Sequence, residues 1–328
     1  MDIRQPLPQS GGAVLLTDGG IETDLIFRQG WDLPDFAAFV LLADGTGREA
    51  LRNYYRPYLL LAASAGFGLV LETPTWRASR DWGRRLGYDA AGLERVNRQG
   101  VWLLNELREE AAPMSVPVLV SGCIGPRADG FDSDDVMSAE QAEEYHAPQV
   151  DALAASASDL VTALTLAYPA EAIGVVRAAG HAGVPVVISF TVRTDGRLPD
   201  GSSLEEAIRQ VEQETQGAPA YYMVNCAHFS HLRDTFGGAA FPPWTSRLRG
   251  LRANASERSH AELDAAADLD DGDPRQFGAQ FVKLLADLPA LTVLGGCCGT
   301  DARHIEAVAR SISHAGRTRA PIANDSGD

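Results

Sequence analysis

The feature that most constrains the fold of this chain is a series of eight short apolar runs, each followed by a helical pattern or a long loop. The runs are continuous rather than alternating, which is typical of parallel strands buried on both faces. They span residues 13–16, 69–72, 118–121, 159–163, 185–190, 221–224, 249–253 and 291–294, of which 249–253 is the weakest. Eight strands that alternate with helices favour a single closed (β/α)8 TIM barrel over an open sheet. No Gly-x-Gly-x-x-Gly motif follows the first run, which weakens a dinucleotide-binding alternative.

Helical patterns occupy the segments between these runs. A long one covers residues 90–112, and others cover 170–179 and 275–288. Ser138, Ser203 and Ser259 each stand three residues before a Gln or Glu, the spacing of a capping box at a helix N-terminus. We therefore expect a barrel domain over residues 13–315, preceded by a poorly ordered segment 1–12 and followed by a flexible tail 316–328.

Composition excludes several classes of protein. The chain has 328 residues, of which 45% are hydrophobic, and a net charge of −16, which argues against nucleic acid or an anionic membrane as a partner. We find no targeting signal at the N-terminus and no apolar run of transmembrane length. The four cysteines, two of them adjacent, do not resemble a disulfide framework. These features predict a cytoplasmic protein that acts on small molecules, as a monomer or homodimer.

Polar and sulfur-containing residues gather directly after the predicted strands. In a barrel, the carboxyl ends of the strands form the active site. The candidate substrate-binding residues at these ends are Asp18, Gly19, Gly20, Glu22, Glu72, Thr73, Trp76, Ser121 and Asn225. The turn at residues 17–23 also fits a simple helix N-cap, in which acidic side chains favour the helix dipole.

Three cysteines form the most specific pattern in the chain. Cys297 and Cys298 lie between glycines on a strand-to-helix turn, Leu294-Gly295-Gly296-Cys297-Cys298-Gly299-Thr300. Adjacent cysteines are poor disulfide partners within one tight turn, but both can bind one metal ion. Cys226, after the sixth strand, can supply the third ligand, since strands six and eight lie close together at the barrel mouth. A single buried cysteine is usually inert packing, but packing does not call for two thiols flanked by three glycines. Nothing pairs Cys123 with this group.

Three thiolates select a soft or borderline cation, most often zinc, and leave its fourth coordination position open. Because three thiolates donate so much charge, the ion is a weak Lewis acid and poorly suited to making hydroxide. It is well suited to holding a fourth thiolate, since metal binding deprotonates a thiol that is mostly protonated at neutral pH. The pattern therefore indicates alkyl transfer to a substrate thiol.

The motifs resemble those of the homocysteine S-methyltransferase family, in the same order and over nearly the whole chain. They are Asp18-Gly19-Gly20, Ser121-Gly122-Cys123-Ile124-Gly125-Pro126, Val224-Asn225-Cys226 and Gly295-Gly296-Cys297-Cys298-Gly299-Thr300. The resemblance implies a (β/α)8 barrel with Zn²⁺ bound by Cys226, Cys297 and Cys298. It also implies methyl transfer to homocysteine, giving methionine, and binding of the homocysteine amino group by Asp18. The donor would be a sulfonium or ammonium compound such as S-methylmethionine, S-adenosylmethionine or a betaine-like molecule.

One position departs from the family pattern. After the fourth strand, members commonly carry Glu-Thr, and that Glu helps to hold the amino group of the acceptor. Here Leu164 stands at that position, before Thr165. An apolar side chain cannot pair with an ammonium group, so either Glu22 or Glu72 takes over or the acceptor is a different thiol.

A mechanism follows as a hypothesis. The acceptor thiol occupies the fourth zinc position, loses its proton and attacks the donor methyl group in line, with most of the acceleration supplied by alignment. A cationic donor can rest against an aromatic face. Trp76 is the candidate, with Trp31 and Trp244 less well placed, and simple packing is an equally good explanation for all three.

Three alternatives remain open. A hydrolase with zinc-bound water would use the same barrel, but no obvious His/Asp base pair accompanies the cysteines in the sequence. His228 and His231 follow Cys226 in a predicted loop, where a histidine is more often solvated or locally hydrogen-bonded. A structural zinc site in a binding protein would lack an open coordination position. The chain could also be one subunit of a multicomponent methyltransferase.

Overall fold

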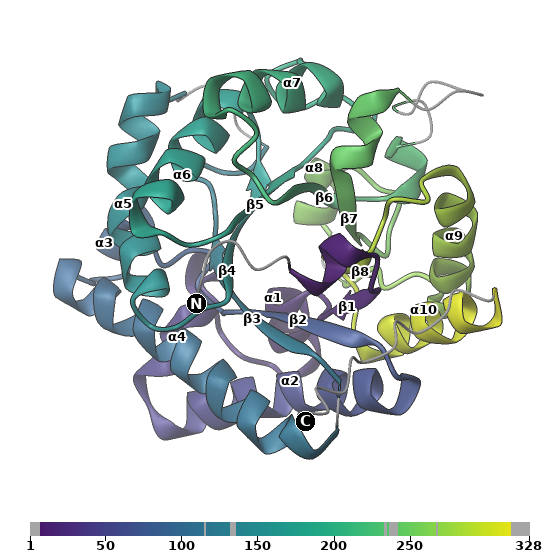
Figure 1. The fold of residues 1–328 in the computed structure, drawn as a ribbon. Helices are drawn as coiled ribbons and strands as arrows, with labels where there is room; N and C mark the ends of the chain where they lie inside the picture. Colours follow the sequence, from purple (N-terminus) through teal and green to yellow (C-terminus); the bar gives the residue numbers. More distant parts are fainter. Residues whose placement is uncertain are drawn as a thin grey trace, which may run out of the picture.

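A computed structural model describes residues 7–114, 116–131, 136–232, 235, 242–266 and 268–315. Within these residues, eight parallel strands form a closed barrel in the order β1 to β8, and helices surround it (Figure 1). The strands are β1 (Leu15–Thr17), β2 (Gly68–Glu72), β3 (Val118–Ile124), β4 (Leu160–Leu166), β5 (Val186–Phe190), β6 (Tyr221–Ala227), β7 (Leu248–Ala253) and β8 (Val293–Gly296). Each strand overlaps a predicted apolar run, so the predicted (β/α)8 barrel is confirmed.

The described residues form ten α-helices, of which seven begin after a residue whose side chain caps the helix. They are α1 (Ile21–Thr23), α2 (Gly45–Ala65), α3 (Arg80–Arg85), α4 (Ala90–Ala111), α5 (Ala139–Ala154), α6 (Pro169–Ala182), α7 (Leu204–Thr215), α8 (His260–Asp264), α9 (Pro274–Asp287) and α10 (Ala302–His314). Ser138, Ser203 and Ser259 form the expected capping boxes before α5, α7 and α8. Each serine side chain thereby satisfies a backbone N–H group that the helix leaves unpaired.

Three strands run three residues further than their apolar cores predict. β3, β4 and β6 extend to Ile124, Leu166 and Ala227, so Asn225 and Cys226 lie inside β6 and not after it. The register shifts in β4 between Ala163 and Leu166, and in β6 between Asn225 and Ala227. A bulge of this kind redirects the side chains of a strand, and both bulges lie at the carboxyl end of the barrel.

The amino end of the barrel is closed by an apolar layer. Its members come mostly from the first residues of the strands: Leu15, Val70, Leu119, Leu160, Val187, Tyr221, Met223 and Val293. The 3-10 helix Pro8–Gly11 approaches this end, where Gln9 Nε2 donates a 3.1 Å hydrogen bond to Tyr221 Oη. Residues 1–6 and the tail 316–328, both predicted to lack order, lie outside the described residues. Because the amino end is filled, the carboxyl end is where a ligand can enter.

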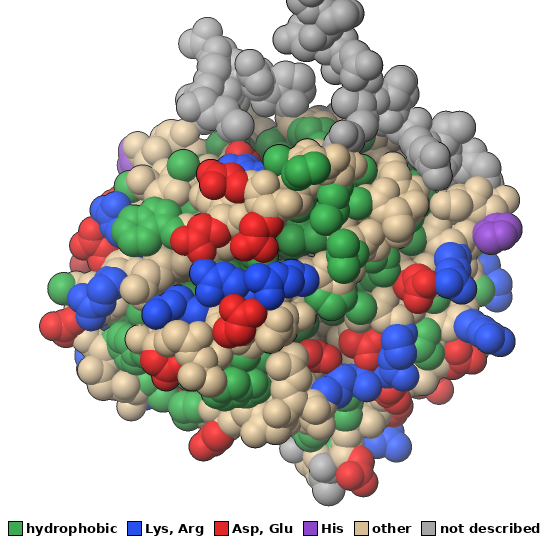
Figure 2. All heavy atoms as spheres, turned by 90° about the horizontal axis from the view of Figure 1, so that it is seen from below, with side chains coloured by type: hydrophobic (Ala, Val, Ile, Leu, Met, Phe, Trp, Pro, Cys, Tyr) green, Lys and Arg blue, Asp and Glu red, His purple; other side chains and the backbone are tan. Residues whose placement is uncertain are grey.

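The outer surface mixes charges of both signs. Figure 2 shows Lys and Arg side chains lying beside Asp and Glu on one side of the barrel. Ion pairs join helices α2 and α4, with Arg52 Nη2 2.6 Å from Glu106 Oε2 and Arg56 Nη2 3.6 Å from Glu110 Oε2. No helix among the described residues is both long and apolar enough to span a membrane.

Candidate active site at the carboxyl end of the barrel

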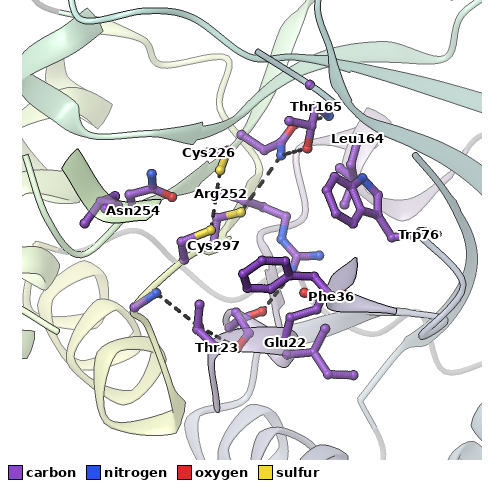
Figure 3. Close-up of a pocket in the computed structure, with 18 of the residues that line it drawn as sticks. Glu22, Thr23, Phe36, Trp76, Leu164, Thr165, Cys226, Arg252, Asn254 and Cys297 are labelled. Carbon is purple, nitrogen blue, oxygen red and sulfur yellow. Dashed lines mark hydrogen bonds between the residues drawn. The ribbon is translucent and has the colours of Figure 1, made fainter. Parts of the chain in front are cut away.

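A cavity of about 310 Å³ opens at the carboxyl end of the barrel (Figure 3). The predicted site residues that line it are Asp18, Gly19, Gly20, Glu22, Glu72, Thr73, Trp76, Asn225, Cys226, Cys297 and Cys298. Ser121, the remaining predicted site residue, does not line the cavity. It is fully buried, and its Oγ lies 2.7 Å from Thr162 Oγ1. The structure thus brings together residues from strands β1, β2, β6 and β8 that are far apart in the sequence.

The three predicted metal ligands converge on one side of the cavity. The Sγ atoms of Cys226, Cys297 and Cys298 all lie within 4.8 Å of one another, and those of Cys226 and Cys298 are 3.5 Å apart. Zinc bound tetrahedrally at about 2.3 Å from each sulfur requires sulfur atoms roughly 3.8 Å apart. The three thiols therefore fit a single zinc ion. Hydrogen bonds from Cys226 and Cys298 lower the pKa of the Cys297 thiol, and the charge of Arg252 adds to this effect.

Asn225 holds the strand ends around the cysteines. Its Oδ1 accepts hydrogen bonds from Thr165 N at 2.8 Å and from Ser189 Oγ at 2.7 Å. Its Nδ2 donates to Thr165 Oγ1 at 2.8 Å and lies 3.9 Å from Cys297 Sγ. Thr165 and Cys226 both have left-handed backbone conformations, with φ of 64° and 57°. This conformation is rare for a β-branched residue such as Thr165, and the bonds to Asn225 hold it in place.

The two glycine-rich turns pack directly against each other. A Cβ atom on Gly20 would lie 2.5 Å from the carbonyl oxygen of Cys297, and one on Gly296 would lie 2.0 Å from Thr300 Oγ1. Gly20 N also donates a 3.1 Å hydrogen bond to the Thr300 carbonyl oxygen. Glycine is required here because the turn that carries Asp18 touches the backbone of the cysteine turn.

Asp18 is paired with a residue that the sequence patterns did not reveal. Arg252 Nη2 lies 3.0 Å from Asp18 Oδ1, and Tyr54 Oη donates a 3.0 Å hydrogen bond to Asp18 Oδ2. Arg252 also donates from Nε to the Gly296 carbonyl oxygen at 3.0 Å and from Nη2 to the Gly19 carbonyl oxygen at 2.9 Å. Burial raises the pKa of Asp18, and the Arg252 guanidinium opposes that rise. The sequence signal that could have revealed Arg252 is its position as a charged residue near the end of the weak apolar run 249–253.

Two further acidic side chains face this region. Burial raises the pKa of Glu22 to about 7, with a further upward contribution from the Cys297 thiolate. Burial likewise raises the pKa of Glu72 to about 7, while Arg252 and hydrogen bonds from Ser121 oppose it. Glu72 is only 5% exposed and its Oε2 has no hydrogen-bond partner.

The opposite wall of the cavity is aromatic and apolar. Leu164 and Trp76 lie there, away from the cysteines, whereas Phe36, which also lines the cavity and is 44% exposed, lies next to Glu22 (Figure 3). The guanidinium of Arg77 lies 3.9 Å from the centre of the Trp76 ring and 3.7 Å from that of Trp82. One face of Trp76 is thus covered by a cation of the protein itself, which leaves less of the ring for the predicted contact with a cationic donor.

The remaining candidates have local partners. Thr73 Oγ1 lies 2.6 Å from Thr75 Oγ1 and accepts a hydrogen bond from Cys123 N at 2.8 Å. His228 Nδ1 lies 2.8 Å from Ser230 Oγ, and His231 Nε2 lies 2.9 Å from the Glu257 carbonyl oxygen. Neither histidine lines the cavity. His260 does, and its Nε2 lies 3.6 Å from Oδ1 of Asp129, which also lines the cavity, so the site holds a His/Asp pair that the sequence patterns did not reveal.

A family model described as homocysteine S-methyltransferase matches residues 15–312. The chain belongs to the homocysteine S-methyltransferase family. The resemblance predicted from the motifs is therefore confirmed, and with it the assignment of the chain as a methyltransferase.

Solved structures give the same fold. Two are crystal structures of the homocysteine methyltransferase MmuM from Escherichia coli. The metallated form is 23% identical with a TM-score of 0.69, and the match covers 93% of this chain and 99% of that one. The oxidised form is 24% identical with a TM-score of 0.67, covering 90% and 94% of the two chains. A search of curated protein sequences gave no match.

Proposed function

We propose that this methyltransferase moves a methyl group from a sulfonium or ammonium donor to the sulfur of homocysteine, giving methionine, with Zn²⁺ held by Cys226, Cys297 and Cys298. The observation that carries the proposal is the convergence of three thiols on one wall of a cavity large enough for small molecules. Family membership supports homocysteine as the acceptor, and the metallated state named for the Escherichia coli neighbour supports a metal.

The protein's own residues have separate tasks in this scheme. Zinc held by the three thiolates would keep the acceptor sulfur deprotonated and nucleophilic at neutral pH. Asn225 orients Cys297 and the strand end that carries Cys226. The ion pair of Arg252 with Asp18 joins the turn after β1 to the carboxyl end of β7. In the reaction a bond forms between the acceptor sulfur and the methyl carbon, the bond from that carbon to the donor sulfur or nitrogen breaks, and the thiol proton passes to solvent.

The aromatic wall is suited to the donor. Phe36 and Trp76 line the cavity, and an aromatic face attracts an onium group. Since Arg77 already occupies one face of Trp76, Phe36 is the less encumbered of the two rings. The three candidate donors are S-methylmethionine, S-adenosylmethionine and betaine-like compounds, each of which carries an onium group.

The deciding experiment measures zinc content and methionine formation in one reduced preparation, with homocysteine and each candidate donor in turn. We expect about one zinc per chain and methionine from one donor. A folded, reduced protein that contains no zinc would overturn the proposal.

Replacing one ligand tests the cysteine cluster itself. We expect Cys298→Ala to lose zinc and methyl transfer together, because two thiolates are too few for a stable zinc site. Cys123→Ala is the matched control, since Cys123 is buried but stands outside the cluster, and it should retain zinc. Full methyl transfer by Cys298→Ala would contradict the scheme.

The chemistry also bears on where and how the protein works. Thiols as close as Cys226 and Cys298 are easily oxidised to a disulfide. We therefore propose that the protein acts in a reducing cytoplasm, as a monomer or homodimer, in methionine biosynthesis.

A further inference from the structure

Of the three acidic side chains on the inner walls of the cavity, only one forms an ion pair with a basic side chain among the described residues. Asp18 is paired with Arg252 at 3.0 Å. No basic nitrogen of the described residues lies within the 4.0 Å of an ion pair from the carboxylate of Glu22 or of Glu72. A buried carboxylate without a partner is costly unless a ligand satisfies it. The cavity is therefore suited to a cationic group of a substrate.

Glu22 and Glu72 differ in access to the cavity. Glu72 is only 5% exposed, and its Oε2 is sealed from solvent without a hydrogen-bond partner. Glu22 is partly exposed, lines the cavity, and has no side-chain hydrogen-bond partner among the described residues. In Figure 3 it lies next to Phe36, below the Arg252 guanidinium. Of the two, Glu22 is the one a ligand can reach without displacing protein groups.

Glu22 is also close to the sulfur chemistry. It follows the Asp18-Gly19-Gly20 turn, which packs against the backbone of Cys297. In homocysteine, four bonds separate the sulfur from the amino nitrogen. A thiol held at the cysteine cluster can therefore direct its ammonium group to the neighbouring wall. The wall formed by β4 cannot receive it, because Leu164 lines the cavity there and Asn225 occupies the backbone N–H and side chain of Thr165.

We propose that Glu22 binds the α-ammonium group of the thiol acceptor and so makes the site specific for an amino-acid thiol. The inference rests on the proposed function, because it assumes a thiol acceptor held at the cysteine cluster. It assigns to α1 the role that an acidic side chain at position 164 would otherwise fill.

The test compares two thiols that differ only in the amino group. L-Homocysteine and 4-mercaptobutanoate have the same carbon chain, thiol and carboxylate, and 4-mercaptobutanoate lacks the ammonium. Their dissociation constants are measured by calorimetry on the zinc-loaded, reduced protein without donor. We expect Glu22→Gln to weaken homocysteine binding roughly 10- to 100-fold, the loss of one charge-assisted hydrogen bond, and to change 4-mercaptobutanoate binding less than about twofold.

Two further variants sharpen the test. Glu22→Gln/Leu164→Glu restores a carboxylate on the opposite wall of the cavity, and we expect it to regain part of the lost affinity for homocysteine only. Glu94→Gln on α4 is the matched control, because Glu94 is exposed and its carboxylate pairs with Arg98. It should bind both thiols as the wild type does. A misfolded Glu22→Gln protein would lose both thiols, so retained 4-mercaptobutanoate binding verifies the fold.

The outcomes separate the two proposals. If the wild type binds homocysteine and Glu22→Gln binds it equally well, the role of Glu22 is overturned and the proposed function stands. A loss seen with Glu72→Gln instead, or an effect of Glu22→Gln on the donor alone, also overturns it. If the zinc-loaded wild type binds neither thiol, the proposed function fails and this inference fails with it.

Discussion

Glu72 combines an ionisable carboxyl group with almost complete burial. Burial raises its pKa from 4.5 to about 7, so the folded protein binds this proton more tightly than the unfolded chain. The resulting stabilisation is present in full below pH 4.5 and is lost as the pH rises through 7. We expect the free energy of unfolding of the wild type, relative to Glu72→Gln, to fall by about 3 kcal/mol between pH 4 and pH 8.

Chemical denaturation across this pH range measures the difference. Glu94→Gln serves as the control, because Glu94 is solvent-exposed, and its difference from the wild type should not vary with pH. If the difference between the wild type and Glu72→Gln is also constant, Glu72 ionises in the fold as it does in water.

At the level of strands, Asn225 joins β4, β5 and β6 directly before Cys226, the first of the proposed zinc ligands. Removing its side chain leaves Thr165 N, Thr165 Oγ1 and Ser189 Oγ without their partner. Each buried group that loses its partner costs about 1–3 kcal/mol. We expect Asn225→Ala to lower the free energy of unfolding by about 3–5 kcal/mol and to weaken zinc binding, because Cys226 follows directly in the same bulged strand end.

Ser189→Ala is the matched comparison for that variant. It removes a single hydrogen bond to Asn225 and leaves Thr165 held, so we expect a loss of about 1 kcal/mol and unchanged zinc affinity. Equal effects of the two variants on zinc would show that Asn225 does not position the ligand strand. Both quantities come from denaturant titration and competition with a zinc chelator.

The turns after β1 and β8 give a second prediction at this scale. A methyl group on Gly20 would lie 2.5 Å from the Cys297 carbonyl oxygen, so Gly20→Ala must push the cysteine turn away. We expect a loss of about 1–3 kcal/mol in stability and weaker zinc binding. Gly45→Ala at the start of α2 meets no atom within 4 Å and should be neutral. If both variants bind zinc normally, contact between the turns does not position the ligands.

The strands explain why part of the fold and of the candidate site could be predicted from the sequence and part could not. Apolar runs report burial, so they located all eight strands, and the cysteine pattern indicated three thiols that lie within 4.8 Å of one another. The bulge at Thr165 depends on hydrogen bonds to Asn225, which lies 60 positions away in another strand, directly before Cys226. Arg252 reaches the turn after β1 across 233 positions. No local pattern carries such contacts, so the strand ends and the Asp18–Arg252 pair appear only in the folded chain.

For the molecule as a whole, the cysteine cluster joins two strands that do not pair directly. Cys226 lies in β6, and Cys297 and Cys298 follow β8, with β7 between them. A metal ion bound there connects segments about 70 residues apart and binds the folded barrel in preference to the unfolded chain. Free zinc at 1,000 times its dissociation constant stabilises a fold by about 4 kcal/mol. We expect this to raise the Tm by roughly 6 °C.

Thermal unfolding of the reduced protein, with zinc and with a chelator, measures this linkage. The Cys298→Ala protein should unfold at the same temperature in both conditions, because it lacks a complete ligand set. Oxidation provides an independent comparison. The Sγ atoms of Cys226 and Cys298 lie 3.5 Å apart, so a disulfide between them would occupy two ligands and prevent zinc from binding. An oxidised wild type should therefore show no zinc-dependent shift in Tm, and reduction should restore it. A zinc-dependent shift that persists in Cys298→Ala would place the stabilising ion elsewhere on the barrel.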